Sequence, residues 1–166
     1  MGWLLKVAKT NEEKAVQRIY DSLTDEQKLF VAPKGKFVTK SPYLRHRLLA
    51  DGDTGFADLY ILPGMKNQAF LTMAVSPEHQ GHGIGRYLLE SAIQKAKDDA
   101  AIDSIVYRTA ATNKPSLHIG GKAGKLRSRT DDDVEFEIDT KEKPISPSTK
   151  KLVSKVLQAY RAQHSV

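Results

Sequence analysis

Residues 70–86 read FLTMAVSPEHQGHGIGR, and this stretch decides the fold of the chain. An apolar run ends at Ser76 and Pro77, a turn with three alternating glycines follows, and the helical pattern YLLESAIQKAK comes next. Glycines let a backbone approach a ligand closely, and the free N–H groups of a first helical turn attract anions. The order of strand, glycine turn and helix therefore predicts a phosphate-binding site.

The glycine spacing excludes two common phosphate loops. A Walker loop requires GxxxxGK[ST], which this region lacks, and a dinucleotide loop requires GxGxxG where this chain has GxGxG. What remains is V-x-P-x-x-Q-G-x-G-x-G over residues 75–85. This pattern resembles the acyl-CoA pyrophosphate loop of the GNAT superfamily of N-acetyltransferases at every motif position. The alternative interpretation is a glycine-rich turn that binds nothing.

A second segment is similar to another motif of the same family, N-x-x-[SA]-[IL]-x-[LI]-Y-x-K-x-G-F. Six positions match in register, namely Asn113, Ser116, Leu117, Ile119, Lys122 and Gly124. Two positions depart from it. Gly120 stands where the family usually has the tyrosine that protonates the departing thiolate, and Lys125 replaces the aromatic residue.

The resemblance implies a set of contacts to acetyl-CoA as co-substrate. The backbone N–H groups from Gln80 to Arg86 would hold the pyrophosphate, the Gln80 side chain could add a donor, and Arg86 could supply charge. The end of the preceding strand would pair with the pantetheine arm where the sheet parts beyond Val75, and an N–H near Ala74 would stabilise the oxyanion. The residues expected at this site are Met73, Ala74, Val75, Gln80, Gly81, His82, Gly83, Ile84, Gly85, Arg86, Asn113 and Ser116.

The catalytic side chains are less clearly marked. A thiolate with a pKa of ~8.5 leaves readily, but an amine with a pKa of ~10 must first lose a proton, so a base is expected. Asp58 is a candidate because its predicted strand lies beside the glycine-loop strand, and Tyr60 or Tyr107 could act as the acid. The chain has no cysteine, so we expect direct attack by the amine in a ternary complex.

The apolar spacing also predicts the remaining elements. The sequence predicts strands at residues 3–8, 44–50, 55–62, 68–75, 104–109, 126–130 and 134–139. Helices are expected at about 11–23, 24–31, 84–97, 113–124 and 149–163. The order is β-α-α-β-β-β-α-β-α-β-β with an extra C-terminal helix. This is similar to the GNAT fold, an α/β protein with a mixed sheet in which the strands at 68–75 and 104–109 run parallel.

Composition sets further limits. The chain has 166 residues, a net charge of +6, no cysteine and no apolar run of about 18 residues. We therefore expect a cytoplasmic protein with no membrane span and no metal site. Residues 1–140 are predicted to form the acyl-CoA-binding domain, and 141–166 a basic linker with an amphipathic helix. That basic segment indicates a solvated helix face, or alternatively contact with nucleic acid.

The predicted function is an acetyl-CoA-dependent N-acetyltransferase. Its acceptor would be the primary amine of a small molecule or a protein. The acids of residues 131–139 form either a solvated outer face or an attractor for a cationic amine. Two alternatives remain open: a catalytically degenerate protein that binds acyl-CoA or a partner, and an acyltransferase or binder that acts on nucleic acid. The oligomeric state is not predicted.

Overall fold

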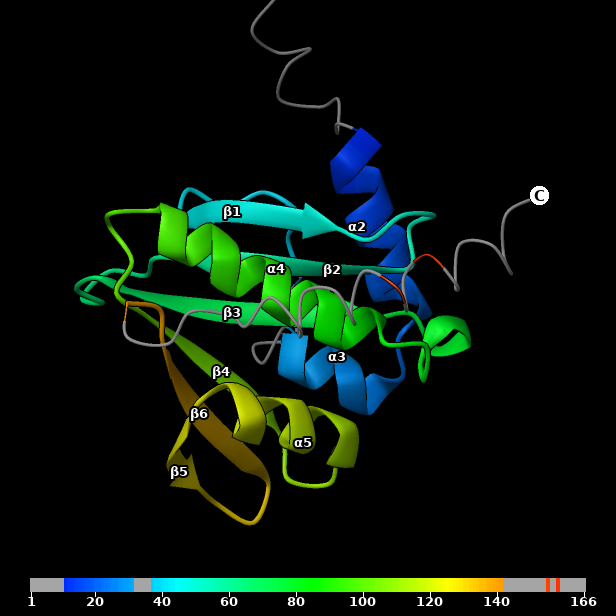
Figure 1. Ribbon diagram of the computed structural model, residues 1–166. Coiled ribbons are helices and arrows are strands. Elements are labelled where there is room, and N and C mark those ends of the chain that lie inside the picture. The colour runs from blue at the N-terminus through cyan, green and yellow to red at the C-terminus, as the bar shows by residue number, and fades with distance from the viewer. Residues whose placement is uncertain (1–10, 32–36, 142–154, 156–157, 159–166) are drawn as a thin grey trace, which may run out of the picture.

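The computed structural model describes residues 11–31 and 37–141, together with Lys155 and Gln158, which are both helical. A six-stranded sheet with the order β1-β2-β3-β4-β6-β5 has helices on both faces (Figure 1). The strands are β1 Leu44–Leu49, β2 Gly55–Tyr60, β3 Gln68–Val75, β4 Ser104–Ala110, β5 Lys125–Arg129 and β6 Asp133–Asp139. The helices are α2 Asn11–Ser22, α3 Asp25–Val31, α4 Ile84–Asp98 and α5 Lys114–Ala123, with a 3-10 turn η1 at Pro77–His79.

This architecture confirms the mixed α/β fold predicted from the sequence. β1, β2 and β3 form an antiparallel meander, and α4 leads to β4, which runs parallel to β3. The predicted strand 68–75 has the bounds of β3, and the other described elements differ from their predicted ends by a few residues at most. The predicted strand at 3–8, the linker and most of the helix at 149–163 lie outside the described residues.

Two apolar layers hold the helices to the sheet. On one face, α4 buries Leu88, Leu89 and Ile93 in the main core, and α5 packs beside it. On the other face, α2 packs Val16 and Ile19 against the sheet. Because α4 and α5 lie opposite α2 and α3, a gap in the sheet would connect the two faces (Figure 1).

The two parallel strands separate partway along their length. β3 pairs with β4 only from Gln68 with Ser104 to Leu71 with Tyr107. Beyond this point β3 stays paired with β2 up to Val75, and β4 stays paired with β6 up to Ala110. Each strand follows its outer neighbour, so the sheet opens. The prediction that the strands part beyond Val75 was wrong, since they part after Leu71.

The packing of α5 on β6 explains the glycine that replaces the family's tyrosine. A Cβ atom at Gly120 would lie 2.6 Å from Cδ2 of Phe136, well inside the closest ordinary contact. A Cβ at Gly124 would lie 2.5 Å from the carbonyl oxygen of Glu137. The helix therefore sits so close to β6 that any side chain at position 120 must displace the Phe136 ring.

We predict that Gly120→Ala destabilises the fold by about 1–3 kcal/mol, the usual cost of overpacking a core. The matched control is Gly121→Ala, whose Cβ meets nothing closer than 3.9 Å and gains helix propensity. Urea unfolding of both variants measures the difference. Equal stability of the two variants would show that Phe136 moves aside freely.

The turn after α4 is fixed by a buried carboxylate. Asp99 accepts hydrogen bonds from Nε of Arg45 at 2.7 Å, from Nε2 of His46 at 2.7 Å and from the backbone N–H of Ala101 at 2.9 Å. The Arg45 hydrogen bond, followed by that from Ala101, holds the pKa of Asp99 far below its usual range. The ionised form of Asp99 therefore stabilises the folded state.

Asp99→Asn should cost about 2 kcal/mol of stability at pH 7, as expected for a hydrogen-bonded charged group. The folded-state pKa is depressed, so this stabilisation is complete above the unfolded pKa of ~3.9 and falls as pH drops toward the folded pKa. The difference between wild type and variant should shrink below about pH 4. Thermal unfolding from pH 2 to 7 tests this, with the exposed Asp98→Asn as control. A difference that stays constant with pH would contradict it.

Candidate active site

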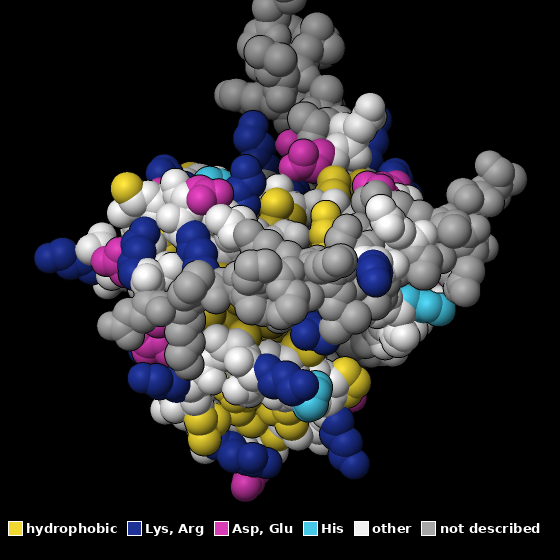
Figure 2. All heavy atoms as spheres, viewed as in Figure 1, with side chains coloured by type: hydrophobic (Ala, Val, Ile, Leu, Met, Phe, Trp, Pro, Cys, Tyr) yellow, Lys and Arg dark blue, Asp and Glu magenta, His cyan; other side chains and the backbone are white. Residues whose placement is uncertain are grey.

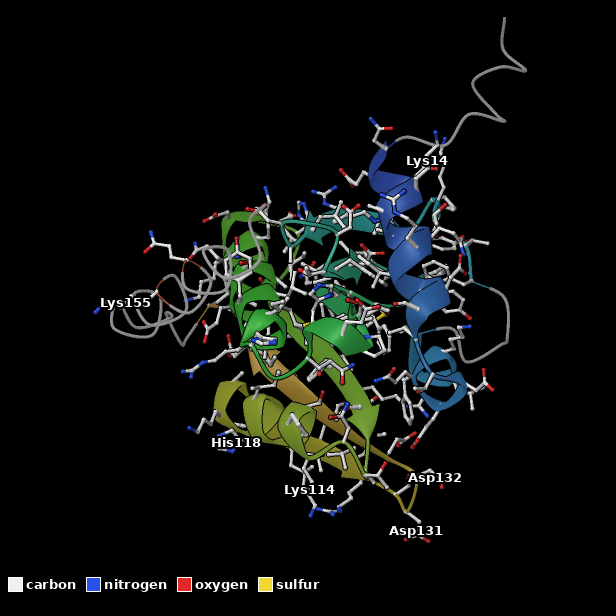
Figure 3. The ribbon with its side chains drawn as sticks, turned by 90° about the vertical axis from the view of Figure 1, so that its right-hand side faces the viewer. Lys14, Lys114, His118, Asp131, Asp132 and Lys155 are labelled. Atoms are coloured by element: carbon white, nitrogen blue, oxygen red, sulfur yellow. The ribbon has the colours of Figure 1, made fainter. Side chains whose placement is uncertain are left out.

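A cavity of about 670 Å³ occupies the opening between β3 and β4. Its walls come from both faces of the sheet. One wall is formed by the loop at 79–86 and the first half of α5, the other by α3 and Leu23, and the floor by the ends of β3 and β4. In Figure 3, α4 and α5 lie on one side of the sheet and α3 on the other. The cavity therefore joins the two faces through the gap.

One end of the cavity is an uncapped helix start. Gly83 is the N-cap of α4 with a φ of 81°, and Gly81 has the same φ, a conformation that glycine adopts without strain. No side chain caps α4, its first turn has no acidic residue, and its first helical hydrogen bond runs from the Tyr87 N–H to Gly83. The amides of Ile84, Gly85 and Arg86 therefore lack an intrahelical acceptor and suit an anion.

The loop before α4 is fastened to the end of β3. The side-chain amide of Gln80 donates to the carbonyl of Val75 at 3.0 Å. Ser76 Oγ lies 2.6 Å from Nδ1 of His79, and the Ser76 N–H donates to Thr54 at 2.9 Å. Gln80 was expected to reach the pyrophosphate with its side chain, but the structure shows that amide holding the loop.

The exposed edge of β3 has an alternating set of backbone groups. The backbone N–H and C=O groups of successive residues in a strand point alternately to its two sides. The Ser76 N–H points to β2, so the N–H and C=O of Ala74 also point to β2. Those of Met73 and Val75 point the other way, into the gap. The Val75 carbonyl already accepts from Gln80. The N–H and C=O of Met73 and the N–H of Val75 thus face the gap. Ala74 lines the cavity, and its own N–H points to β2.

Tyr107 lies in the floor of the cavity. Its side chain is buried, and this burial raises the pKa of the Tyr107 phenol, while contacts with the hydroxyls of Ser116 and Thr109 partly oppose the rise. Ser116 belongs to the first turn of α5, where its N–H donates to Oδ1 of the N-cap residue Asn113 at 3.2 Å. The phenol is therefore protonated at neutral pH, beside Ser116 of the second motif and Thr109 of β4, which both line the cavity.

The structure separates the other two catalytic candidates from the cavity. Asp58 is fully buried and accepts from Nε and Nη2 of Arg47 at 2.9 and 2.8 Å. The Tyr60 hydroxyl donates to the same carboxylate at 3.1 Å, and burial, with the Asp58 charge, raises the Tyr60 pKa. Neither residue is among those lining the cavity. The expectation that Asp58 faces the cleft is not met, because its oxygens are committed to Arg47.

The predicted co-substrate contacts gather closely, with one exception. The cavity is lined by Met73, Ala74, Val75, Gln80, Gly81, Gly83, Ile84, Gly85, Arg86, Asn113 and Ser116, but not by His82. The cavity is also lined by four residues of α3 that were not expected at the site, namely Glu26, Gln27, Phe30 and Val31. The helical pattern of α3 was detected, but nothing local indicates which side of a short helix meets a gap formed by distant strands.

The acidic run of residues 131–139 does not line the cavity. Asp133 accepts from Nε of Arg108 at 2.8 Å, and Glu135 lies 3.7 Å from Nε of Arg127. Asp131 and Asp132 project outward from the tip between β5 and β6 (Figure 3). This placement favours the solvated outer face over an acceptor-binding patch.

Other kinds of site find no support in the described part of the chain. Among residues 11–31 and 37–141, no group of three or more potential ligands could hold a metal ion. The helices within these ranges are all too short or too polar to cross a bilayer. On the face shown in Figure 2, Lys and Arg side chains are scattered rather than gathered in one patch.

Solved structures with a similar fold include two N-acetyltransferases. A variant of the spermidine N-acetyltransferase from Vibrio cholerae is 16% identical, with a TM-score of 0.61 over 80% of this chain and 94% of that chain. The ribosomal-protein-S18-alanine N-acetyltransferase from Escherichia coli is 17% identical, with a TM-score of 0.55 over 82% and 93%. These likenesses show a shared fold.

A smaller part of this chain aligns with yncA from Salmonella typhimurium, a putative acetyltransferase whose structure was solved with its cofactor acetyl-CoA. It is 21% identical, with a TM-score of 0.47 over 55% of this chain and 61% of that chain, so this chain spans about three fifths of its length. No curated protein matches the sequence. A model of the acetyltransferase (GNAT) family matches residues 16–123, well over half of the sequence. The chain therefore belongs to the GNAT acetyltransferase family, whose co-substrate is acetyl-CoA.

Proposed function

We propose that this protein transfers an acetyl group from acetyl-CoA to a primary amine by direct attack in a ternary complex. One observation carries the proposal: β3 and β4 lose their pairing after Leu71 and Tyr107, and a cavity lined by elements from both sheet faces fills the gap. We infer that the two reactants contact walls on opposite faces of the sheet and meet between the strands.

Three properties of the cavity suit acetyl-CoA: its charge, the backbone groups along the edge of β3, and its volume. The uncapped amides at the start of α4 offer hydrogen bonds to a diphosphate, and Arg86 adds a positive charge at the same end. The edge groups of Met73 and Val75 can pair with an amide-bearing arm as a strand would. A volume of about 670 Å³ is within the usual range of small-molecule sites.

The reaction joins the amine nitrogen to the acetyl carbon and breaks the carbon–sulfur bond. The nitrogen loses one proton and the sulfur gains one, so no other reactant is needed. An N–H on the edge of β3 is placed to stabilise the developing oxyanion. Tyr107 is the candidate donor to sulfur, since its raised pKa keeps the phenol protonated and its side chain lines the cavity.

A second candidate function is binding of acyl-CoA without catalysis. The observation that favours it is at position 120, where this chain has glycine instead of the family's tyrosine. The Phe136 ring occupies the space that a side chain at this position would need. The two candidates differ in one measurement. A protein that binds acetyl-CoA but releases no CoA thiol with any amine would be the second, and steady turnover would eliminate it.

Acetyl-CoA should raise the melting temperature by about 5 °C or more at 100 times its Kd, where linkage gives ~2.7 kcal/mol. Gly85→Glu should weaken binding at least roughly tenfold, because it places a carboxylate at the uncapped helix start. Gln94→Glu, which adds the same charge later in α4, is the matched control. Differential scanning fluorimetry and calorimetric titration measure both effects. Equal affinities of the two variants would argue against the proposed diphosphate site.

Tyr107→Phe should lower kcat by about 100-fold while acetyl-CoA affinity stays near wild type, because general acids typically contribute this much. Tyr60→Phe is the control, because it removes a half-buried phenol of β2 that does not line the cavity. Thiol release with a panel of amines reports kcat for both. If the two variants turn over equally, Tyr107 is not the acid.

A further inference from the structure

We propose that Glu26 binds a cationic group of the acceptor, so that the preferred acceptors are aliphatic amines with a second positive charge. This inference rests on the proposed acetyl transfer and names its substrate class. It comes from the wall contributed by α3, which the sequence analysis did not assign to the site. α3 packs on both β3 and β4, so it covers the gap from the face opposite α5.

The charges around the cavity single out this residue. Glu26 is the one carboxylate among the described residues that line it. Of the two lining arginines, Arg86 lies at the start of α4, and Arg108 is bound to Asp133. The α3 wall therefore carries a negative charge that no cation on the wall neutralises, whereas the start of α4, across the sheet from α3, suits phosphate.

The position of the Glu26 carboxylate is set from across the opening. The Thr112 hydroxyl donates to its Oε1 at 3.2 Å, which links α3 to the segment between β4 and α5. In the described chain no Lys, Arg or His nitrogen lies within 4.0 Å of its carboxylate oxygens. One oxygen is oriented by the protein, and the carboxylate keeps its full charge for a ligand.

Glu26 is exposed, and most of the other residues on its wall are apolar. Leu23, Phe30 and Val31 line the same wall, and Met73 lies on the floor. Such a lining favours the methylene groups of an aliphatic chain. A chain with an ammonium group at each end would place one charge at Glu26 and the other nitrogen in the gap, near Tyr107. An acceptor with a distal carboxylate would instead meet like charge.

A simpler role for Glu26 is to stabilise the start of α3, where acidic residues favour the helix dipole. Asp25, in the same first turn, would do this equally well but does not line the cavity. Asp25→Asn is therefore the matched control for Glu26→Gln. A role limited to helix stability predicts the same outcome for both variants.

The test measures binding and turnover separately. The ligands are 1,4-diaminobutane, 1-aminobutane and 4-aminobutanoate, repeated with the six-carbon series, and each is titrated calorimetrically into the full chain with and without CoA. Wild type should bind at least one diamine about 5–10 times more tightly than the matching monoamine, as for a favourable ion pair of ~1 kcal/mol. Glu26→Gln should remove this preference, and Asp25→Asn should keep it.

Each outcome has a defined meaning. Loss of the preference in Glu26→Gln alone supports the inference, and a matching loss of kcat/KM for diamines but not for monoamines extends it to turnover. Equal binding of diamine and monoamine by wild type, or equal behaviour of the two variants, overturns it. Because the titration needs no chemistry, a protein that binds diamines through Glu26 yet shows no acetyl transfer would refute the proposed function and leave the cation site standing.

Discussion

The site depends on a single constraint: β3 and β4 cannot stay paired with each other and also follow their outer neighbours. After Leu71 and Tyr107 each strand keeps its antiparallel partner, and the parallel pairing between them ends. Backbone groups freed in a sheet need other hydrogen-bond partners, because an unpaired buried amide is costly. The groups of Met73 and Val75 that face the gap therefore form an edge ready for a strand-like ligand. The cavity is a consequence of strand pairing rather than of any one side chain.

The same geometry redistributes the catalytic chemistry. α5 lies so near β6 that Phe136 occupies the place of a side chain at position 120, and the family's tyrosine has no room there. Tyr107 belongs to β4 at the last paired position, where the gap begins. Its phenol is buried and lines the cavity next to Ser116. The proton donor proposed here thus comes from the floor of the gap, since α5 has no tyrosine at position 120.

The sequence predicts best those features that local chemistry determines. The glycines at 81 and 83 adopt positive φ, and the N–H groups after them begin a helix, as the spacing indicates without any tertiary information. Asp58 shows the limit. The alternation of side chains along β2 predicts that Asp58 shares a face of the sheet with Phe56 and Tyr60. It does not predict that Arg47 of β1 binds the Asp58 carboxylate on that face. The α3 wall was missed for a similar reason: its contribution depends on where β3 and β4, which are distant in sequence, diverge.

The charges of the site differ between its two walls, which lie on opposite faces of the sheet. At the start of α4 the partial positive charge of the amides is left uncapped, and Arg86 reinforces it. On the α3 wall, Glu26 is negative and is held by an uncharged hydroxyl. In the proposed reaction, a polyanionic donor would be drawn to the start of α4 and a cationic acceptor to the α3 wall. The acetyl group and the amine would then meet beside Tyr107 without a covalent intermediate, which a chain lacking cysteine could not form on sulfur.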